Sequence, residues 1–213
     1  MSDLKARLLG VLLAGGLSRR MGGGDKCMIP IAGKPMLGHA IDRLAPQVGA
    51  MVINANGDPG RFAGFGLTVV PDTIEGFAGP LAGVLAGLQW ARQHCPGVTH
   101  IVSAASDTPF FPTDLARRFA AAAMGDTPTI ALAETGGTLH PVFGLWPVAV
   151  SDDLEEWLKT SRNRKVLAFV DLFPSLTVAF DGAPTPGGLD PFFNANSPED
   201  LQRAETALAE AAS

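Results

Sequence analysis

The chain has 213 residues, of which 46% are hydrophobic and 17% are charged, and its formal net charge at pH 7 is −5. This composition predicts a globular protein with a substantial core, and an acidic chain without a basic stripe is not expected to bind nucleic acid. No apolar run approaches the ~20 residues that a membrane helix needs, so we expect no membrane span. The two cysteines, Cys27 and Cys95, form no C-x-x-C or metal-ligand spacing, and we expect free thiols in a cytoplasmic protein.

Apolar strand-like runs alternate with amphipathic helix-like segments along the whole chain. We expect strands at 8–14, 50–53, 67–70, 99–104, 129–133, 139–146 and 176–180, and a short extended piece at 28–31. We expect helices at 35–48, from 80 to before Pro96, from 112 beyond Phe119, at 152–159, at 164–169 and from 198 through Leu208. Pro141 predicts an edge or irregular position for its strand, because proline cannot donate a hydrogen bond to a neighbouring strand. This alternation predicts a single α/β domain with a largely parallel sheet.

Polar residues follow several of these predicted strands at the point where each strand ends. Gly15, Asn54, Asp72 and Asp107 all occupy such positions. Because ligands of parallel sheets bind beyond the carboxyl ends of the strands, we expect these four residues to gather at one edge.

The segment from Leu8 to Lys26 reads LLGVLLAGGLSRRMGGGDK and combines a buried strand with a glycine-rich, cationic loop. Glycine lets backbone N–H groups approach a ligand closely, and Arg and Lys supply positive charge, so the loop suits a polyanion. A secretory signal is disfavoured because no cleavage site precedes Arg19, and neither a Walker A loop nor a dinucleotide fingerprint is present. A merely flexible surface loop is the alternative that remains open.

The string LAGGLSRRMGGGDK resembles the signature loop of nucleoside-triphosphate transferases, and its Asp25-Lys26 ending resembles most the molybdenum cofactor guanylyltransferase family. The resemblance implies a three-layer α/β/α, Rossmann-like nucleotidyltransferase fold, also called the nucleotide-diphospho-sugar transferase fold, with a mainly parallel sheet. It implies one domain over residues 1–213, whose N-terminal part binds GTP and whose C-terminal part helps bind a pterin acceptor. The implied reaction transfers GMP from GTP to the terminal phosphate of molybdopterin or the molybdenum cofactor, releases pyrophosphate and uses Mg²⁺ or Mn²⁺. Other cofactor-biosynthesis proteins and molybdoenzyme chaperones are the implied protein partners.

The same resemblance assigns roles to individual residues. The implied nucleotide-binding residues are Leu13, Ala14, Gly15, Gly16, Lys26, Asn54, Asp72, Gly79, Pro80, Leu81 and Asp107. Arg20, Lys26 and Asp107 are implied to be catalytic, with Arg20 and Lys26 on the triphosphate and Asp107 on the metal ion. The acceptor is implied to contact His140, Asn194 and Asn196.

Several of these assignments have a structural alternative, including His140, since a lone histidine is more often structural. Asp107 could simply cap the turn before Pro109, and Asn54 and Asp72 could be ordinary turn residues. The segment 79–83 could be a helix start that packs closely through Gly83. The string FNANSPEDL at 193–201 could be a turn before a helix that Ser197 and Asp200 cap.

Three other functions remain to be separated from the implied one. A molybdopterin cytidylyltransferase and a sugar-phosphate nucleotidyltransferase would use the same loop. A non-catalytic nucleotide-binding or cofactor-carrier protein is the alternative from another class, and the presence of Arg20, Lys26 and Asp107 argues against it.

Overall fold

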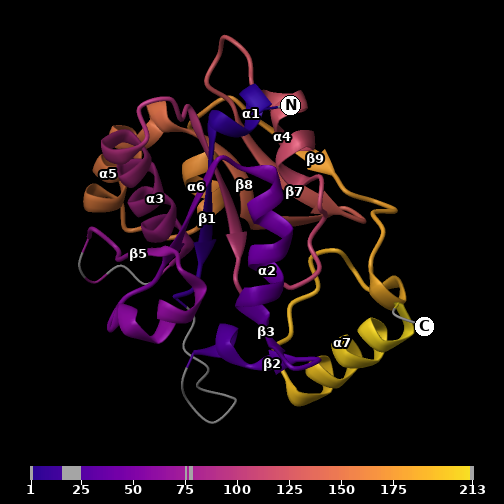
Figure 1. The fold of residues 1–213 in the computed structure, drawn as a ribbon. Coiled ribbons are helices and arrows are strands. Elements are labelled where there is room, and N and C mark those ends of the chain that lie inside the picture. Colours follow the sequence, from indigo (N-terminus) through magenta and orange to yellow (C-terminus); the bar gives the residue numbers. More distant parts are fainter. Residues whose placement is uncertain (1, 16–24, 75, 77–78, 212–213) are drawn as a thin grey trace.

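A seven-stranded sheet forms the centre of the computed structural model, which describes residues 2–15, 25–74, 76 and 79–211 (Figure 1). In spatial order the strands are β5 (Thr68–Val70), β4 (Ala50–Asn54), β1 (Leu8–Leu13), β6 (His100–Ala105), β8 (Thr138–Pro147), β7 (Ile130–Thr135) and β9 (Ser175–Ala179). Strand β8 is antiparallel to both of its neighbours, and every other adjacent pair is parallel. The prediction of an α/β protein with a mainly parallel sheet is confirmed.

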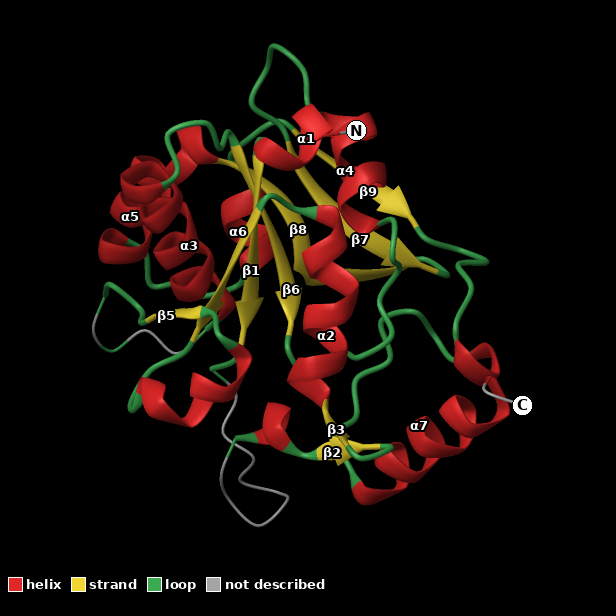
Figure 2. Ribbon diagram, viewed as in Figure 1, coloured by secondary structure: helices red, strands yellow, loops and turns green. Residues whose placement is uncertain are grey.

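Helices cover both faces of this sheet, as Figure 2 shows. On one face lie α2 (Met36–Leu44) and α4 (Leu115–Ala123), and on the other lie α3 (Pro80–His94), α5 (Ser151–Thr160) and α6 (Val166–Val170). Successive side chains of a strand point to opposite faces, so in β1 Leu8 and Leu12 join the first core while Leu9 and Val11 join the second. The three-layer α/β/α prediction is therefore confirmed.

The C-terminal segment returns to the carboxyl edge of the sheet and packs on a small hairpin (Figure 1). Helix α7 (Pro198–Ala211) lies beside β2 (Pro30–Ile31) and β3 (Lys34–Pro35), and a third apolar cluster joins them. The remaining elements are α1 (Ser2–Ala6) and the 3-10 helices η1 (Lys26–Met28), η2 (Ala45–Gln47), η3 (Pro59–Phe65), η4 (Val148–Val150) and η5 (Pro186–Gly188). The predicted cap of α7 is present, because Ser197 Oγ accepts from Asp200 N at 3.2 Å and Asp200 Oδ2 accepts from Ser197 N at 3.1 Å.

Strand β8 departs from the expectation that was based on Pro141. The edge position is wrong, because β8 lies between β6 and β7. The irregularity is confirmed: the β7–β8 register shifts between Leu132 and Ala133, and the β6–β8 pairing reaches only to Gly144. Pro141 lies past the end of that pairing and opposite the shift, so its missing N–H interrupts no regular ladder.

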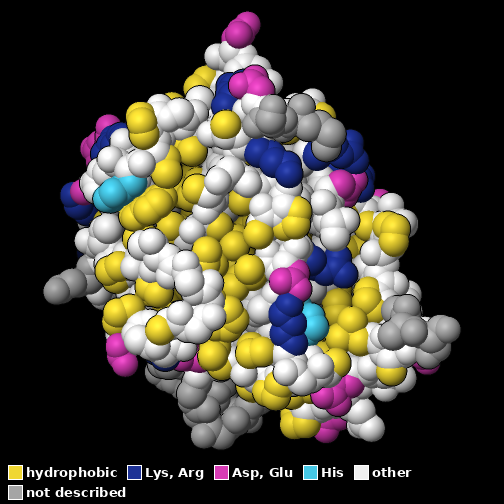
Figure 3. Space-filling model, viewed as in Figure 1, with side chains coloured by type: hydrophobic (Ala, Val, Ile, Leu, Met, Phe, Trp, Pro, Cys, Tyr) yellow, Lys and Arg dark blue, Asp and Glu magenta, His cyan; other side chains and the backbone are white. Residues whose placement is uncertain are grey.

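Among the residues that the structure describes, no helix has the length and apolar character required to cross a bilayer. Figure 3 shows one face, on which Lys and Arg side chains form small separate groups that are interspersed with Asp and Glu.

Candidate functional site

The carboxyl ends of β1, β4, β5 and β6 are tied together by hydrogen bonds that continue beyond the strands. Ala14 N donates to Asn54 O at 2.9 Å, and both N and Oγ of Ser106 donate to Leu13 O at 3.2 and 2.9 Å. These bonds fix Leu13 and Ala14 in the middle of the edge and leave Gly15 exposed. The predicted site residues Gly16 and Arg20 lie outside the described residues.

Lys26 lies at the meeting point of this edge and the C-terminal segment. Its Nζ lies 2.6 Å from Asp107 Oδ2 and donates to Asn194 Oδ1 at 2.6 Å and to Asn196 Oδ1. A lysine ammonium has three N–H donors, so all three are used by these acceptors. Its side chain is only 13% exposed. The structure thus brings together two of the predicted catalytic residues and two of the predicted acceptor-binding residues.

Asp107 has the chemistry of a ligand for a hard cation. Its carboxylate is 23% exposed and follows β6 at the carboxyl edge, and Lys26 makes the one hydrogen bond to it among the described residues. No group of three or more His, Cys, Asp or Glu side chains that could hold a metal occurs in the described parts of the chain. Mg²⁺ often takes one or two carboxylates and completes its shell with phosphate oxygens and water, so a single Asp fits such an ion.

A second polar cluster consists of Asn54, Asn56 and Asp72, and we call it the base-side cluster after the role that we propose for it. Asn54 Nδ2 donates to Asp72 Oδ1 at 2.9 Å, and Asn56 Nδ2 donates to Asp72 Oδ2 at 2.8 Å. Asn56 Oδ1 accepts from Asp72 N at 2.9 Å, so both side chains hold Asp72 in one orientation. Asn54 is buried and also donates to Val70 O, which makes it a support for Asp72. The carboxylate of Asp72 keeps lone pairs for further donors.

The first turn of α3 packs directly on this cluster. Gly79 and Pro80 are exposed at the start of the helix and Leu81 is buried. A Cβ on Gly83 would lie 2.2 Å from Asn54 Oδ1 and 2.6 Å from a methyl group of Leu13, so only glycine permits this approach. The close packing through Gly83 is confirmed, and it brings the N-terminus of α3 to the same edge.

Cys27 follows Lys26 in the sequence, and its side chain is buried. Burial raises the pKa of its thiol to about 11, and the nearby carboxylates of Asp25 and Asp107 act in the same direction, while a hydrogen bond with Ser106 opposes them. A thiol with a pKa raised this far is protonated near neutral pH, which makes it a weak nucleophile.

His140, in β8, takes part in a series of hydrogen bonds with Thr135 and Asp190. Its Nε2 lies 2.7 Å from Thr135 Oγ1, and Thr135 donates to Asp190 Oδ2 at 3.1 Å. Its ring stacks on Phe192 with centroids 4.5 Å apart. Burial lowers the pKa of His140 below its usual value, although the carboxylate of Asp190 opposes the shift.

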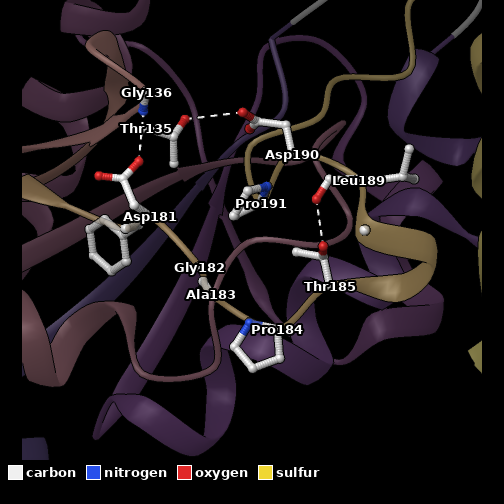
Figure 4. A pocket seen from close by; sticks show the side chains of 12 residues that line it. Thr135, Gly136, Asp181, Gly182, Ala183, Pro184, Thr185, Leu189, Asp190 and Pro191 are labelled. Atoms are coloured by element: carbon white, nitrogen blue, oxygen red, sulfur yellow. Dashed lines mark hydrogen bonds between the residues drawn. The ribbon is translucent and has the colours of Figure 1, made fainter.

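A cavity of about 510 Å³ lies next to Thr135 and Asp190 (Figure 4). It lies between the β7–β8 turn and residues 180–191, and Asp181 Oδ1 accepts from Gly136 N at 2.8 Å on its wall. Phe193 N donates to Asp190 O at 2.9 Å, so a tight turn leads from the cavity wall toward Asn194.

Sequence reasoning missed three residues at this edge. Asn56 stands in the string VINAN, where its neighbour Asn54 was assigned and Asn56 was not. Asp25 and Arg61 form an ion pair, with Oδ2 and Nε 3.1 Å apart, beside Lys26. Sequence alone carries no signal for that pair, because η3 brings Arg61 back to the loop only in the folded chain.

Comparison with known proteins identifies the family of the chain. A family model described as "MobA-like NTP transferase domain" matches residues 10–175. The chain belongs to this family. A relative from Bradyrhizobium sp. (strain ORS 278), named molybdenum cofactor guanylyltransferase, is 54% identical over 196 residues, which cover 92% of this chain and 91% of the relative. The family membership that the loop predicted is confirmed.

Solved structures share the fold of this family member. Molybdopterin-guanine dinucleotide biosynthesis protein A from Archaeoglobus fulgidus superposes with a TM-score of 0.71 at 21% identity, covering 95% of this chain and 98% of that one. A Mycobacterium tuberculosis H37Rv protein solved in complex with manganese superposes with a TM-score of 0.62 at 20% identity, covering 93% and 97%. These likenesses confirm the Rossmann-like nucleotidyltransferase fold.

Proposed function

We propose that this protein is a nucleotidyltransferase that moves GMP from GTP to the terminal phosphate of molybdopterin or the molybdenum cofactor. The products are pyrophosphate and the guanine dinucleotide form of the cofactor. The observation that carries the proposal is Lys26, whose single ammonium contacts Asp107 on the nucleotide side and Asn194 and Asn196 on the acceptor side. A group-transfer enzyme needs such a junction, because its two substrates must meet at one phosphorus atom.

The reaction that we propose is a displacement at phosphorus. An oxygen of the acceptor phosphate forms a bond to the α-phosphorus of GTP, and the bond from that phosphorus to the bridging oxygen of pyrophosphate breaks. The phosphate nucleophile is ionised near neutral pH, so the chain needs no general base. Catalysis then rests on positioning and on positive charge at the phosphate oxygens, which Lys26 supplies.

Ligand binding must rearrange the contacts of Lys26. Because Asp107, Asn194 and Asn196 use its three donors, we propose that a phosphate oxygen binds Lys26 by replacing one of these three side chains. An Asn that leaves Lys26 frees its Oδ1 acceptor, which can then contact a donor of the acceptor substrate. We propose Asp107 as the residue that holds Mg²⁺ or Mn²⁺, which when bound supplies further positive charge at the phosphates.

We assign selection of the base to the base-side cluster. Guanine offers N1–H and N2–H₂ donors, and the Asp72 carboxylate is an acceptor that Asn54 and Asn56 hold in place. We propose that the segment from Gly79 to Leu81, at the start of α3, also contacts the nucleotide.

We place the acceptor on the half of the site formed by His140, Asn194 and Asn196. The flat face of a pterin ring suits the stacked pair of His140 and Phe192, and its ring N–H groups suit a carboxylate such as Asp190 at the adjoining cavity. We also propose a cytoplasmic location, in keeping with the two free thiols, and contact with the proteins that supply or receive the cofactor.

The test is a transfer assay with purified protein, Mg²⁺ and molybdopterin, in which GTP, CTP, ATP and UTP are compared. We expect pyrophosphate release and a dinucleotide product by mass spectrometry with GTP only, and only when the acceptor is present. Turnover with CTP would instead assign a cytidylyltransferase, and turnover in a parallel assay in which a sugar phosphate replaces molybdopterin would assign a sugar nucleotidyltransferase. Nucleotide binding without pyrophosphate release under all conditions would indicate a non-catalytic protein.

A further inference from the structure

We infer that Arg61 is a positioning residue for the transfer reaction: it holds Asp25, and through Asp25 the adjacent Lys26, against the base-side cluster. The consequence for catalysis rests on the proposed function, whereas the effect on Lys26 does not.

Arg61 lies on η3, in the connection between β4 and β5, and its guanidinium faces the start of η1. Its Nε is buried and lies 3.1 Å from Asp25 Oδ2 as an ion pair without hydrogen-bond geometry. Its Nη2 donates to Asn56 O at 2.6 Å, and its guanidinium carbon lies 4.8 Å from the centre of the Phe62 ring. The guanidinium is therefore held on three sides by protein groups.

Asp25 is the link from this guanidinium to Lys26. Asp25 precedes the first residue of η1, and its backbone oxygen accepts from Met28 N at 3.0 Å. Its carboxylate makes no capping bond to η1, and its side chain is only 13% exposed. A carboxylate that is this buried needs a partner, and Arg61 is the cation that pairs with it among the residues that the structure describes. Holding Asp25 fixes the chain at the residue before Lys26.

Arg61 also joins the two clusters of the site. The residue whose carbonyl it binds, Asn56, pairs with Asp72 through both ends of its side-chain amide. A path of polar contacts thus runs from Asp72 through Asn56 and Arg61 to Asp25, which is joined to Lys26 by a peptide bond. This path sets the position of the phosphate-binding lysine relative to the residues that we assign to the base.

The contacts favour a positioning role over direct contact with the nucleotide. Two nitrogens of the guanidinium already face protein oxygens, and its side chain is 31% exposed. A surface pair such as Arg92 with Asp152, which is 46% and 77% exposed, contributes little to stability and contacts neither cluster. That pair provides a matched control.

The experiment compares Arg61→Ala, Arg61→Lys, Asp25→Asn, the double variant Arg61→Ala/Asp25→Asn and the control Arg92→Ala. The first readout, taken without substrates, is the rate at which acetic anhydride modifies Lys26, followed by mass spectrometry. The second is kcat and KM for GTP in the transfer assay. Thermal unfolding identifies any variant that fails to fold, and Arg61→Lys then keeps the comparison possible.

We expect Lys26 to be acetylated several-fold faster in Arg61→Ala and Asp25→Asn, and at the wild-type rate in Arg92→Ala. We expect kcat/KM to fall about 10- to 100-fold in both single variants, because a displacement of ~1 Å can cost that much. The double variant should be no worse than Arg61→Ala, since both changes break one path. Arg61→Lys should recover part of the loss, because lysine keeps a positive charge near Asp25. The recovery should be incomplete, since lysine lacks the planar guanidinium that also donates to Asn56 O.

Two results would overturn the inference. The first is an unchanged acetylation rate of Lys26 in Arg61→Ala, and the second is a multiplication of the two losses in the double variant, which would mean that Arg61 acts on the nucleotide directly. If the wild-type protein transfers no GMP but Arg61→Ala still exposes Lys26, the proposed function fails and the positioning role stands.

Discussion

The two polar clusters at the carboxyl edge of the sheet are built in different ways. The base-side cluster joins residues that are 16 to 18 positions apart on the neighbouring strands β4 and β5 and their following turns. The cluster around Lys26 instead joins residues that are 81 to 170 positions apart, and one ammonium holds it together. The base-side cluster depends on local strand pairing, whereas the Lys26 cluster depends on docking of α7 and on a single charge. The two clusters should therefore respond differently to substitution.

The largest effect is expected from Lys26→Ala. Removal of the ammonium takes positive charge from the phosphates and leaves Asp107, Asn194 and Asn196 without their common donor, so GMP transfer should fall about 100- to 1,000-fold. The thermal unfolding temperature should also fall modestly, because Asp107 and two amide oxygens lose the largely buried ammonium that donates to them. Lys34→Ala, which breaks the exposed pair with Asp42, is the control. A near-normal rate of transfer in Lys26→Ala would remove this residue from the mechanism.

Asp107→Asn tests the other half of the same pair. The amide keeps the shape of the side chain but is a far weaker metal ligand, so activity should fall about 100-fold and require more Mg²⁺. The measurement is the transfer rate as a function of Mg²⁺ concentration. If the Mg²⁺ dependence of the variant equals that of the wild type, Asp107 does not hold the metal.

Asp72→Asn probes the base-side cluster and leaves the Lys26 cluster intact. One of the two oxygens that accept from Asn54 and Asn56 becomes an NH₂ group, so one amide donor loses its acceptor at a cost of about 1–3 kcal/mol. We expect kcat/KM for GTP to fall about tenfold, mostly through KM, and the preference for GTP over CTP to weaken. Asp126→Asn, at an exposed position, is the control. An unchanged preference would assign the reading of the base to other groups.

Gly83→Ala asks whether the close approach of α3 supports the base-side cluster. The added Cβ would collide with Asn54 and Leu13, so we expect a loss of about 1–3 kcal/mol in the free energy of unfolding and weaker binding of GTP. Gly97→Ala is the matched control, because a Cβ at Gly97 meets nothing within 4 Å. Equal stability of the two variants in urea would show that α3 can shift without cost.

The smallest effect on activity is expected at His100, which begins β6 at the end opposite Asp107. Burial and the nearby charge of Arg7 lower the pKa of His100 from 6.5 to about 4. A lowered histidine pKa favours the neutral form in the folded state, so this stability is present above pH 6.5 and is lost as the pH falls toward 4. The wild type should lose about 2 kcal/mol of unfolding free energy from this group between pH 7 and pH 5.

His100→Gln should show a smaller decrease over the same pH interval, with transfer at pH 7 nearly unchanged. Urea unfolding of both proteins at the two pH values is the measurement. An identical decrease in both would show that His100 is not the group that titrates.

Much of the fold could be predicted from local pattern. The apolar runs and their flanking turn residues placed every strand of the main sheet to within a few residues, because strands that are buried on both faces of a sheet appear in the sequence as continuous apolar runs. The sequence did not reveal α1, a short helix of five residues. It also did not reveal the early end of α2 at Leu44, where Pro46 converts the last turn into a 3-10 helix.

The sequence by itself determined the strand-and-loop motif that identifies the family, and the polar residues that follow strands β1, β4, β5 and β6. Parallel strands carry their carboxyl ends to one edge, so chain order was enough to predict that Asn54, Asp72 and Asp107 would gather there. Only the tertiary structure decided that Lys26 would meet Asn194 and Asn196, and that Arg61 would meet Asp25. Those contacts depend on how α7 and η3 pack, which is set by burial of apolar surface between distant segments and leaves no local pattern in the sequence.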